Sequence, residues 1–420
     1  MIANRKKSNC CGCSACVQRC PRQCISMVED KEGFLYPSVD ETKCVDCGLC
    51  EKVCPTLNQG KECEPLSVYA AKNSDETIRM VSSSGGVFSM LAERIIEKEG
   101  VVFGACWNSD WEVVHDYTES ISGIERFRGS KYVQSRVDGN YKKVESFLKD
   151  GRYVMFSGTP CQIAGLKRYL RKEYEKLVTV DFICHGVPSP GVFRTYLQEE
   201  INKEIVDSAD GGGLALRPCI PLVTGYDGID YNGLKIKSIS FRDKRNGWKK
   251  FGFTFMFSKE EGESLLYSTL DENLFLIGFL RDLYLRPSCY ACPAKQLKSG
   301  SDVTLGDFWG VDSLMPEIDD DKGVSAVTVN TGKGRELLLE IEAELHEVPY
   351  IELVNRNPAL VKSAAIPKCR KRFFKNNSLT FERKIKVLTK ESITLKRILK
   401  KILRLLIPQR VRKLIRRFVY

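Results

Sequence analysis

Histidine is scarce in this sequence, and neither a long apolar run nor a nucleotide-binding glycine motif is present. The chain has 420 residues and only three histidines, which leaves little room for zinc or iron sites built on imidazole. No stretch of about 18 or more apolar residues occurs, so we expect no membrane-spanning helix. No G-x-G-x-x-G motif follows an expected strand, so the sequence does not favour a Rossmann nicotinamide site.

The start of the sequence also lacks the apolar segment of a secretion signal. Residues 1–9 lead directly into a run of cysteines. We therefore expect a cytoplasmic protein whose 18 cysteines serve metal binding or redox chemistry, because disulfides are rare in reducing compartments.

Two cysteine runs of identical spacing are the most informative feature. Each run has the form C-x2-C-x2-C-x3-C-P, which is the spacing of bacterial ferredoxins that carry two 4Fe–4S clusters. In such ferredoxins the fourth cysteine of each run binds the other cluster. The predicted ligands are therefore Cys10, Cys13, Cys16 and Cys54 for one cluster, and Cys44, Cys47, Cys50 and Cys20 for the other. Zinc knuckles or a disulfide framework are the alternative, but zinc sites seldom need a third closely spaced cysteine.

The remainder of the chain predicts a mixed α/β body. We expect a ferredoxin domain over 1–60, α/β domains over 66–150 and 151–350, and a basic amphipathic helical tail over 370–420. Strands alternate with helices after residue 151, which favours a parallel or mixed sheet and an overall α+β or α/β class.

Two finer expectations concern the later part of the body. Residues 235–243 and 248–257 predict a β-hairpin with an Asn-Gly turn at Asn246-Gly247. A helix is expected after Thr331, with apolar residues through Leu345 at helical spacing.

Four further cysteines fall on loops that a sheet could bring together: Cys161, Cys184, Cys289 and Cys292. The first two follow adjacent expected strands, whose carboxyl ends face one crevice. A helix N-terminus lowers a thiol pKa, which favours the first of them as a thiolate. Four thiolates in one place would hold a third cluster; the alternative is a packed thiol with a loop disulfide or a zinc remnant. We assign no role to Cys11, Cys24, Cys63, Cys106, Cys219 and Cys369.

Two segments resemble cofactor loops. The turn from Ser82 to Gly86 opens an expected helix, and such an N-terminus favours an anion. The segment from Phe127 to Ser135 combines a glycine, a lysine and an aromatic residue. An N-capped helix and an ordinary polar loop are the alternatives.

The order of these motifs is similar to one known family. Two ferredoxin motifs are followed by SSSGGVFSMLAE, FRGSKYVQS, SGTPCQIAGLK, DFICHGVPSP, FRDKRNGW and SCYACPAKQLKSGSDVTLGDFWG. Over about residues 8–345 the chain resembles the family of coenzyme F420 hydrogenase/dehydrogenase beta subunits, whose coenzyme is a deazaflavin. Members of that family are FAD-containing iron–sulfur proteins that pass electrons between clusters and a hydride carrier.

The resemblance implies sites on this sequence. It implies an FAD bound by the two cofactor loops, and a third cluster on the four loop cysteines. The implied cofactor contacts are Ser83, Ser84, Gly85, Gly86, Gly129, Ser130, Lys131, Tyr132, Gln134, Ser135, Thr159 and Pro160. Lys131 is the candidate catalytic residue, since its charge could stabilise a reduced, anionic flavin; the alternative is a surface lysine.

We therefore expect an iron–sulfur flavoprotein oxidoreductase that passes electrons between 4Fe–4S clusters and a hydride-carrying substrate through FAD. The alternative is an electron-transfer adaptor that feeds a partner reductase. Expected partners are a redox protein or ferredoxin and a small hydride donor or acceptor, and no nucleic acid.

The C-terminal segment is strongly basic. Residues 368–420 hold 19 of the 65 Lys and Arg but only two of the 54 Asp and Glu. Apolar residues from Leu395 to Phe418 recur at helical spacing among these cations, which is typical of a helix lying on an anionic membrane surface. We expect peripheral attachment at the inner membrane surface, with packing on the protein's own acidic body or on a protein partner as the alternative.

Overall fold

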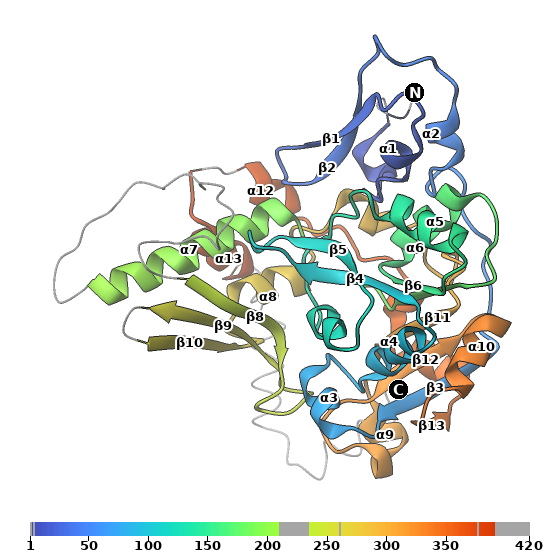
Figure 1. Ribbon diagram of the computed structural model, residues 1–420. Coiled ribbons are helices and arrows are strands. Elements are labelled where there is room, and N and C mark those ends of the chain that lie inside the picture. The colour runs from blue at the N-terminus through green and yellow to red at the C-terminus, as the bar shows by residue number, and fades with distance from the viewer. Residues whose placement is uncertain (1, 3–4, 210–234, 260–261, 376–377, 391–420) are drawn as a thin grey trace.

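Two short strands and two short helices form the N-terminal module, which stands at the top of Figure 1. The computed structural model describes residues 2, 5–209, 235–259, 262–375 and 378–390. The module contains α1 (Ala15–Arg19), an antiparallel pair β1 (Ile25–Glu29) and β2 (Leu35–Val39), and α2 (Leu49–Lys52). Each helix carries the third cysteine of a run, so the two runs build equivalent halves of a ferredoxin-like fold.

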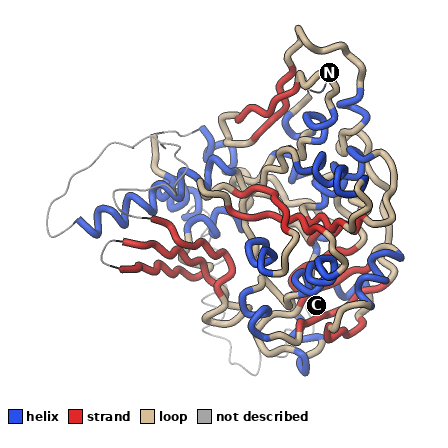
Figure 2. The backbone as a smooth tube through the Cα atoms, in the orientation of Figure 1, coloured by secondary structure: helices blue, strands red, loops and turns tan. Residues whose placement is uncertain are grey.

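An eight-stranded mixed sheet forms the centre of the body (Figures 1 and 2). The strand order is β13-β3-β12-β11-β7-β6-β4-β5. The strands are β3 (Ser67–Asn73), β4 (Val101–Trp107), β5 (Val113–Thr118), β6 (Val154–Ser157), β7 (Leu177–Phe182), β11 (Val303–Asp307), β12 (Ser325–Val329) and β13 (Ala343–Glu347). The inner strands β11, β7, β6 and β4 run parallel, whereas the outer pairs are antiparallel. The expected mixed α/β body is confirmed.

Helices cover both faces of this sheet because its inner strands are apolar on both sides. Phe156 of β6 packs with α5 (Asn140–Lys149) and α6 (Pro160–Leu170), whereas Met155 packs on the opposite face with α4 (Val87–Glu97) and α10 (Gly332–Leu339). Cys13 and Ala15 of the module join the first of these cores. The module therefore sits on the α5–α6 face.

A second sheet carries an aromatic core. Strands β8 (Lys235–Asp243), β9 (Gly252–Lys259) and β10 (Gly262–Thr269) are antiparallel. They pack with α7 (Pro190–Ala209), α8 (Leu274–Leu280), α12 (Arg370–Lys375) and α13 (Phe381–Lys390). Shorter helices α3 (Glu76–Val81), α9 (Val311–Leu314) and α11 (Tyr350–Arg356) connect the remaining elements.

The expected hairpin forms, but its connection is longer than the sequence predicts. Strand β9 begins at Gly252 instead of Trp248. Gly247 does form a turn, at φ +90° with its N–H bonded to the carbonyl of Lys244. The Trp248 side chain is then buried and donates from Nε1 to Asp307 (3.1 Å). Packing of this indole against the central sheet takes precedence over continuing the strand.

The expected helix after Thr331 ends earlier than predicted. Helix α10 stops at Leu339, and Leu345 lies in the edge strand β13. Backbone pairing with β3 decides the conformation there, because Leu345 lies opposite Ala71 in the ladder.

The beginning of the basic segment belongs to the body. Phe373, Phe381, Ile385 and Leu388 are buried in the aromatic core. The amphipathic pattern from Leu395 to Phe418 lies outside the described residues. No helix in the described part of the chain is long and apolar enough to cross a membrane.

Candidate metal and cofactor sites

The thiols of the two cysteine runs line two pockets of the module. Those of Cys10, Cys13, Cys16 and Cys54 line one, which we name the inner pocket. Those of Cys20, Cys44, Cys47 and Cys50 line the other, the outer pocket. Each pocket thus receives three thiols from one run and the last thiol of the other, which is the arrangement predicted from the spacing.

Left-handed residues explain how three thiols of one run turn toward one pocket. Gly12 (φ +73°) and Ser14 (φ +60°) alternate with the cysteines of the first run. Asp46 (φ +48°) and Gly48 (φ +68°) take the same places in the second. Reversal of the backbone between successive cysteines brings their side chains to one side.

The two pockets differ in exposure. Cys13 and Cys16 of the inner pocket are buried, whereas Cys47 of the outer pocket is exposed. The inner pocket faces the body, where a Cβ on Gly165 of α6 would lie 2.9 Å from the Sγ of Cys13. The outer pocket is lined by residues of the module alone.

The pocket chemistry fits iron–sulfur clusters better than single ions. No group of three or more His, Cys, Asp or Glu side chains in the described residues is arranged to hold one metal ion. A cubane is larger than an ion and keeps its four thiolates farther apart than a tetrahedral zinc site does. The all-thiolate donor set is the one that 4Fe–4S clusters use.

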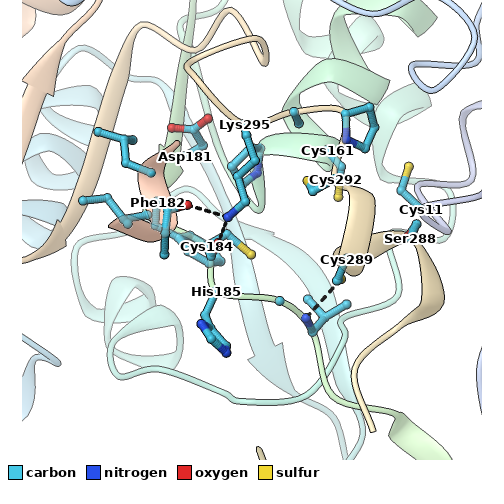
Figure 3. A pocket seen from close by; sticks show the side chains of 18 of the residues that line it. Cys11, Cys161, Asp181, Phe182, Cys184, His185, Ser288, Cys289, Cys292 and Lys295 are labelled. Atoms are coloured by element: carbon cyan, nitrogen blue, oxygen red, sulfur yellow. Dashed lines mark hydrogen bonds between the residues drawn. The ribbon is translucent and has the colours of Figure 1, made fainter. Parts of the chain in front are cut away.

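A third pocket lies at the carboxyl end of β7 (Figure 3). The thiols of Cys161, Cys184, Cys289 and Cys292 line it, and we name it the core pocket. They come from the start of α6, from the segment after β7 and from the short helix Pro287–Ala291 and the residue after it. The structure thus brings together the four loop cysteines that the sequence singles out.

Hydrogen bonds hold the walls of the core pocket. Lys295 donates to the backbone carbonyls of Cys184 and Ala359, both at 2.5 Å (Figure 3). The N–H of Val187 donates to the Sγ of Cys289 (3.5 Å). These contacts fix the backbone on either side of the pocket.

Burial contributes to a raised pKa for every thiol of the core pocket. A hydrogen bond with Cys11 and burial raise the pKa of Cys161 well above the usual thiol range. Burial raises the pKa of Cys289 to about 12. The expectation that the helix N-terminus keeps Cys161 as a thiolate is wrong, because the hydrogen bond with Cys11 and burial raise its pKa instead. Metal binding here must release protons.

Two cysteines without an expected role also line these pockets. Cys11 lines both the inner and the core pocket, and hydrogen bonding with the Cys13 thiol raises its pKa well above the usual thiol range. The Sγ of Cys24 lies 3.4 Å from that of Cys20 at the outer pocket. Neither belongs to a recognisable spacing, so the sequence offers no signal for them.

The two expected cofactor loops meet, but their polar groups already have protein partners. The hydroxyls of Ser83 and Ser130 lie 2.8 Å apart. Ser84 donates to the carbonyl of Val324 (2.7 Å). A Cβ on Gly85 would lie 2.3 Å from the carbonyl oxygen of Ala71, so close packing on β3 explains that glycine.

Lys131 points into the same loop. Its Nζ donates to the carbonyls of Arg126 and Arg128, both at 3.0 Å, and burial lowers its pKa to about 8. Gly129 turns the loop with φ +77° and open space around it. Tyr132 leaves the loop to stack on Phe279 at 4.9 Å.

The remaining predicted cofactor residues lie near the core pocket instead. Gln134 donates from Nε2 to the carbonyl of Cys11 (2.9 Å), and Ser135 accepts from Nε2 of Gln162 (3.0 Å). Thr159 caps α6 and Pro160 lines the pocket. The predicted set thus divides into a group around Ser83 and Lys131 and a group around the core pocket.

A buried arginine beside the loops was not predicted. Arg242 donates to the carbonyl of Ser83 (3.0 Å), to the hydroxyl of Tyr132 (3.3 Å) and to both oxygens of Asp307. Its Nε has no partner in the described residues. It lies within the segment FRDKRNGW, so the sequence marks the region without assigning the residue.

Two family models match segments of the chain. Residues 9–58 match a 4Fe-4S dicluster domain. Residues 151–217 and 221–352 match the C terminus of the coenzyme F420 hydrogenase/dehydrogenase beta subunit.

Individual relatives agree with these matches. The chain is 27% identical over 183 residues to the F component of the F(420)H(2) dehydrogenase of Methanosarcina mazei, covering 41% of this chain and 51% of that protein. It is 43% identical over 65 residues to Ferredoxin 7Fe of Hydrogenibacillus schlegelii, covering 15% and 77% respectively. This chain thus spans about half the length of the dehydrogenase component.

One solved structure shows a distant likeness. A chain of the F420-reducing NiFe hydrogenase complex from Methanosarcina barkeri aligns with a TM-score of 0.40 and 16% identity, over 70% of this chain and 90% of that one.

Proposed function

Because the chain belongs to the family of coenzyme F420 hydrogenase/dehydrogenase beta subunits and carries a 4Fe–4S dicluster domain, we propose that it is an iron–sulfur flavoprotein oxidoreductase. In this proposal, electrons pass between a redox partner protein and a small hydride carrier. A ferredoxin is one such partner, and a deazaflavin is one such carrier. The protein works in the cytoplasm, with its basic C-terminal segment at an anionic membrane surface.

The single observation that carries the proposal is the series of three thiol-lined pockets. The outer pocket has an exposed cysteine, the inner pocket faces the body, and the core pocket lies in the body itself. Cys11 lines both of the last two. A series that begins at the surface and ends inside the enzyme suits electron transfer from a docked partner to an enclosed reaction site.

The residues have separate roles in this scheme. The predicted crossed sets ligate the two clusters of the module, and Cys161, Cys184, Cys289 and Cys292 ligate the third. Clusters supply one electron at a time, and FAD converts between one-electron and two-electron steps. The module carries the partner's electron through the outer pocket, because Cys47 is its most accessible ligand.

The loops at Ser83 and Lys131 are the proposed flavin contacts. The Lys131 ammonium, with a pKa lowered to about 8 by burial, would in this proposal stabilise the negative charge of the reduced ring. Arg242 adds a permanent charge next to Ser83. Both side chains would have to exchange a protein contact for the flavin.

One observation favours the adaptor function as a second candidate. The hydroxyls of Ser83 and Ser84 and the ammonium of Lys131 are all bonded to protein groups. An adaptor without a flavin needs only the three thiol pockets. The two functions therefore differ in whether the chain binds FAD.

The test is anaerobic purification of the full chain with iron, sulfide and flavin quantitation, EPR and a turnover assay with deazaflavin and nicotinamide coenzymes. We expect iron for three 4Fe–4S clusters, one FAD and substrate-dependent turnover. Three clusters without flavin would support the adaptor instead. Zinc without iron would contradict both functions.

A further inference from the structure

Arg286 is a buried arginine at the boundary between the module and the body. Its residue is 1% exposed. Nε donates to the carbonyl of Cys10 (2.7 Å), and Nη2 to the carbonyl of Leu35 (2.8 Å). Nη1 donates to Oε1 of Gln134 (2.9 Å), and Nη2 also approaches the Sγ of Cys10 (3.6 Å). One guanidinium thus bonds to two segments of the module and to the body.

Among the described residues, no carboxylate balances its charge. The structure describes four buried arginines, and three of them are ion-paired: Arg79 with Asp320, Arg242 with Asp307 and Arg370 with Glu32. No carboxylate in the described part of the chain forms an ion pair with Arg286. An unpaired buried charge is costly, so this site calls for an anion that the described side chains do not supply.

Two pockets suited to anions lie on either side of the guanidinium. Arg286 itself lines the core pocket, and it contacts Cys10 of the inner pocket. A 4Fe–4S cluster with four thiolates carries net negative charge, and nearby charge and hydrogen bonds to sulfur set its potential. The ring of Tyr36 lies 4.3 Å from the cation and shields it from water.

The surrounding backbone is shaped to admit this side chain. Gly12 lies between two pocket cysteines at φ +73°, and a Cβ there would lie 2.8 Å from Nη1 of Arg286 and 2.9 Å from Nε2 of Gln134. Any other residue at this position would displace the guanidinium or the amide. The glycine in the first cysteine run therefore leaves room for the guanidinium of Arg286, which lies more than 270 residues later in the sequence.

We propose that Arg286 is the shared counter-cation of the inner and core clusters and raises the reduction potential of both. It is a positioning residue that acts through the cysteines. This inference rests on the proposed function, because it requires clusters in both pockets. A positive charge fixed between two electron carriers favours the electron's presence on either of them over its presence on the outer cluster.

The test is a redox titration of the full-length protein, followed by EPR, for the unchanged chain and four variants. In Arg286→Gln, we expect the inner and core clusters to become at least tenfold harder to reduce, a shift of about 59 mV for a one-electron couple. The outer cluster should shift less than threefold. Arg286→Lys keeps the charge and should stay closer to the unchanged chain than to Arg286→Gln.

The other two variants separate charge from folding. Arg79→Gln removes a buried, ion-paired arginine away from the pockets; it should lower thermal stability and leave all potentials in place. Gln134→Glu retains Arg286 and sets a carboxylate beside it, so potentials should fall in the same direction as in Arg286→Gln. That variant decides the question if Arg286→Gln fails to fold.

Three outcomes have distinct meanings. The inference is overturned, and the proposed function is not, if the clusters are present but the equilibrium constant for their reduction changes less than twofold in both Arg286→Gln and Gln134→Glu. Equal shifts in Arg286→Lys and Arg286→Gln assign the effect to hydrogen bonds and overturn the role of charge. Absence of clusters from the unchanged chain overturns the proposed function itself.

Discussion

At the scale of single residues, the pockets contain more thiols than the clusters need. Cys20 and Cys24 lie 3.4 Å apart at the outer pocket, and the contact with Cys20, together with burial, raises the pKa of Cys24 to about 11. The spacing rule selects Cys20 as the ligand and gives no role to Cys24. Sequence spacing identifies ligands within one loop, but it cannot show which other thiols the fold brings alongside.

The spacing rule makes a testable distinction between these two residues. Cys20→Ser should remove the cluster of the outer pocket and leave the inner one, although Cys20 belongs to the run that builds the inner pocket. Cys24→Ser should retain both clusters. Iron content and the EPR signals of the reduced protein are the measurements, and loss of the inner cluster in Cys20→Ser would contradict crossed ligation.

His115 should make the folded protein sensitive to acid. Burial lowers its pKa to about 4, and its Nδ1 has no partner in the described residues. The unfolded chain binds the proton first, near the ordinary value of about 6.5. Stability is therefore present above that value and is lost as the pH falls from about 6.5 to about 4.

The corresponding experiment is urea unfolding at pH 7 and pH 5. His115→Phe keeps the stacking on Phe156 that the imidazole makes at 5.2 Å. From pH 7 to pH 5, its free energy of unfolding should fall by about 2 kcal/mol less than that of the unchanged chain. Equal losses in both proteins would show that His115 does not titrate on unfolding.

At the scale of elements, α6 joins the module to the sheet. Its first turn carries Cys161 of the core pocket, and its Gly165 makes room for Cys13 of the inner pocket. The sequence predicts this helix from the strand–helix–strand rhythm. It does not predict the contact with the module, because that contact joins segments about 150 residues apart and leaves no local pattern.

Gly165→Ala tests this contact. Alanine should favour the helix by about 1 kcal/mol, but its Cβ would lie 2.9 Å from the Cβ and Sγ of Cys13. We therefore expect loss of the inner cluster despite the gain in helix propensity. Gly139→Ala at the start of α5 is the control, since nothing lies within 4 Å of the added Cβ. Full iron content in Gly165→Ala, measured alongside Gly139→Ala, would contradict the contact.

At the scale of the whole molecule, the C-terminal helices α12 and α13 pack on elements formed much earlier in the chain. Helices α12 and α13 complete the aromatic core of the second sheet, although their composition places them in a basic tail. The sequence marks the charge of this segment correctly. It does not show that the first part of the segment packs on the body, because α12 and α13 are as rich in Lys and Arg as the residues that follow them.

Two truncations should therefore behave differently. A chain ending at residue 390 keeps Phe381, Ile385 and Leu388 in the core and should unfold at the temperature of the full chain. A chain ending at residue 377 loses these three buried side chains, each of which contributes about 1.5–3 kcal/mol. Its thermal transition should fall by several degrees, and an unchanged transition would contradict the packing of α13.

The same truncation at residue 390 tests the membrane role of the basic segment. The full chain should sediment with anionic vesicles and not with neutral ones, since each basic residue near an anionic leaflet contributes about 1 kcal/mol. The shortened chain should stay in the supernatant with both. Equal sedimentation of the two proteins would leave residues 391–420 without this role.

Each run contributes its fourth cysteine to the pocket of the other run, and this determines when the two pockets can form during translation. When the first run has left the ribosome, the inner pocket still lacks its fourth thiol, that of Cys54. Cys20 has also been made by then, but the second run, which supplies the other three thiols of the outer pocket, has not. The outer set is complete only at Cys50 and the inner set only at Cys54, four residues later. Both pockets of the module therefore become available to iron at nearly the same moment of translation, and neither run can assemble its pocket alone.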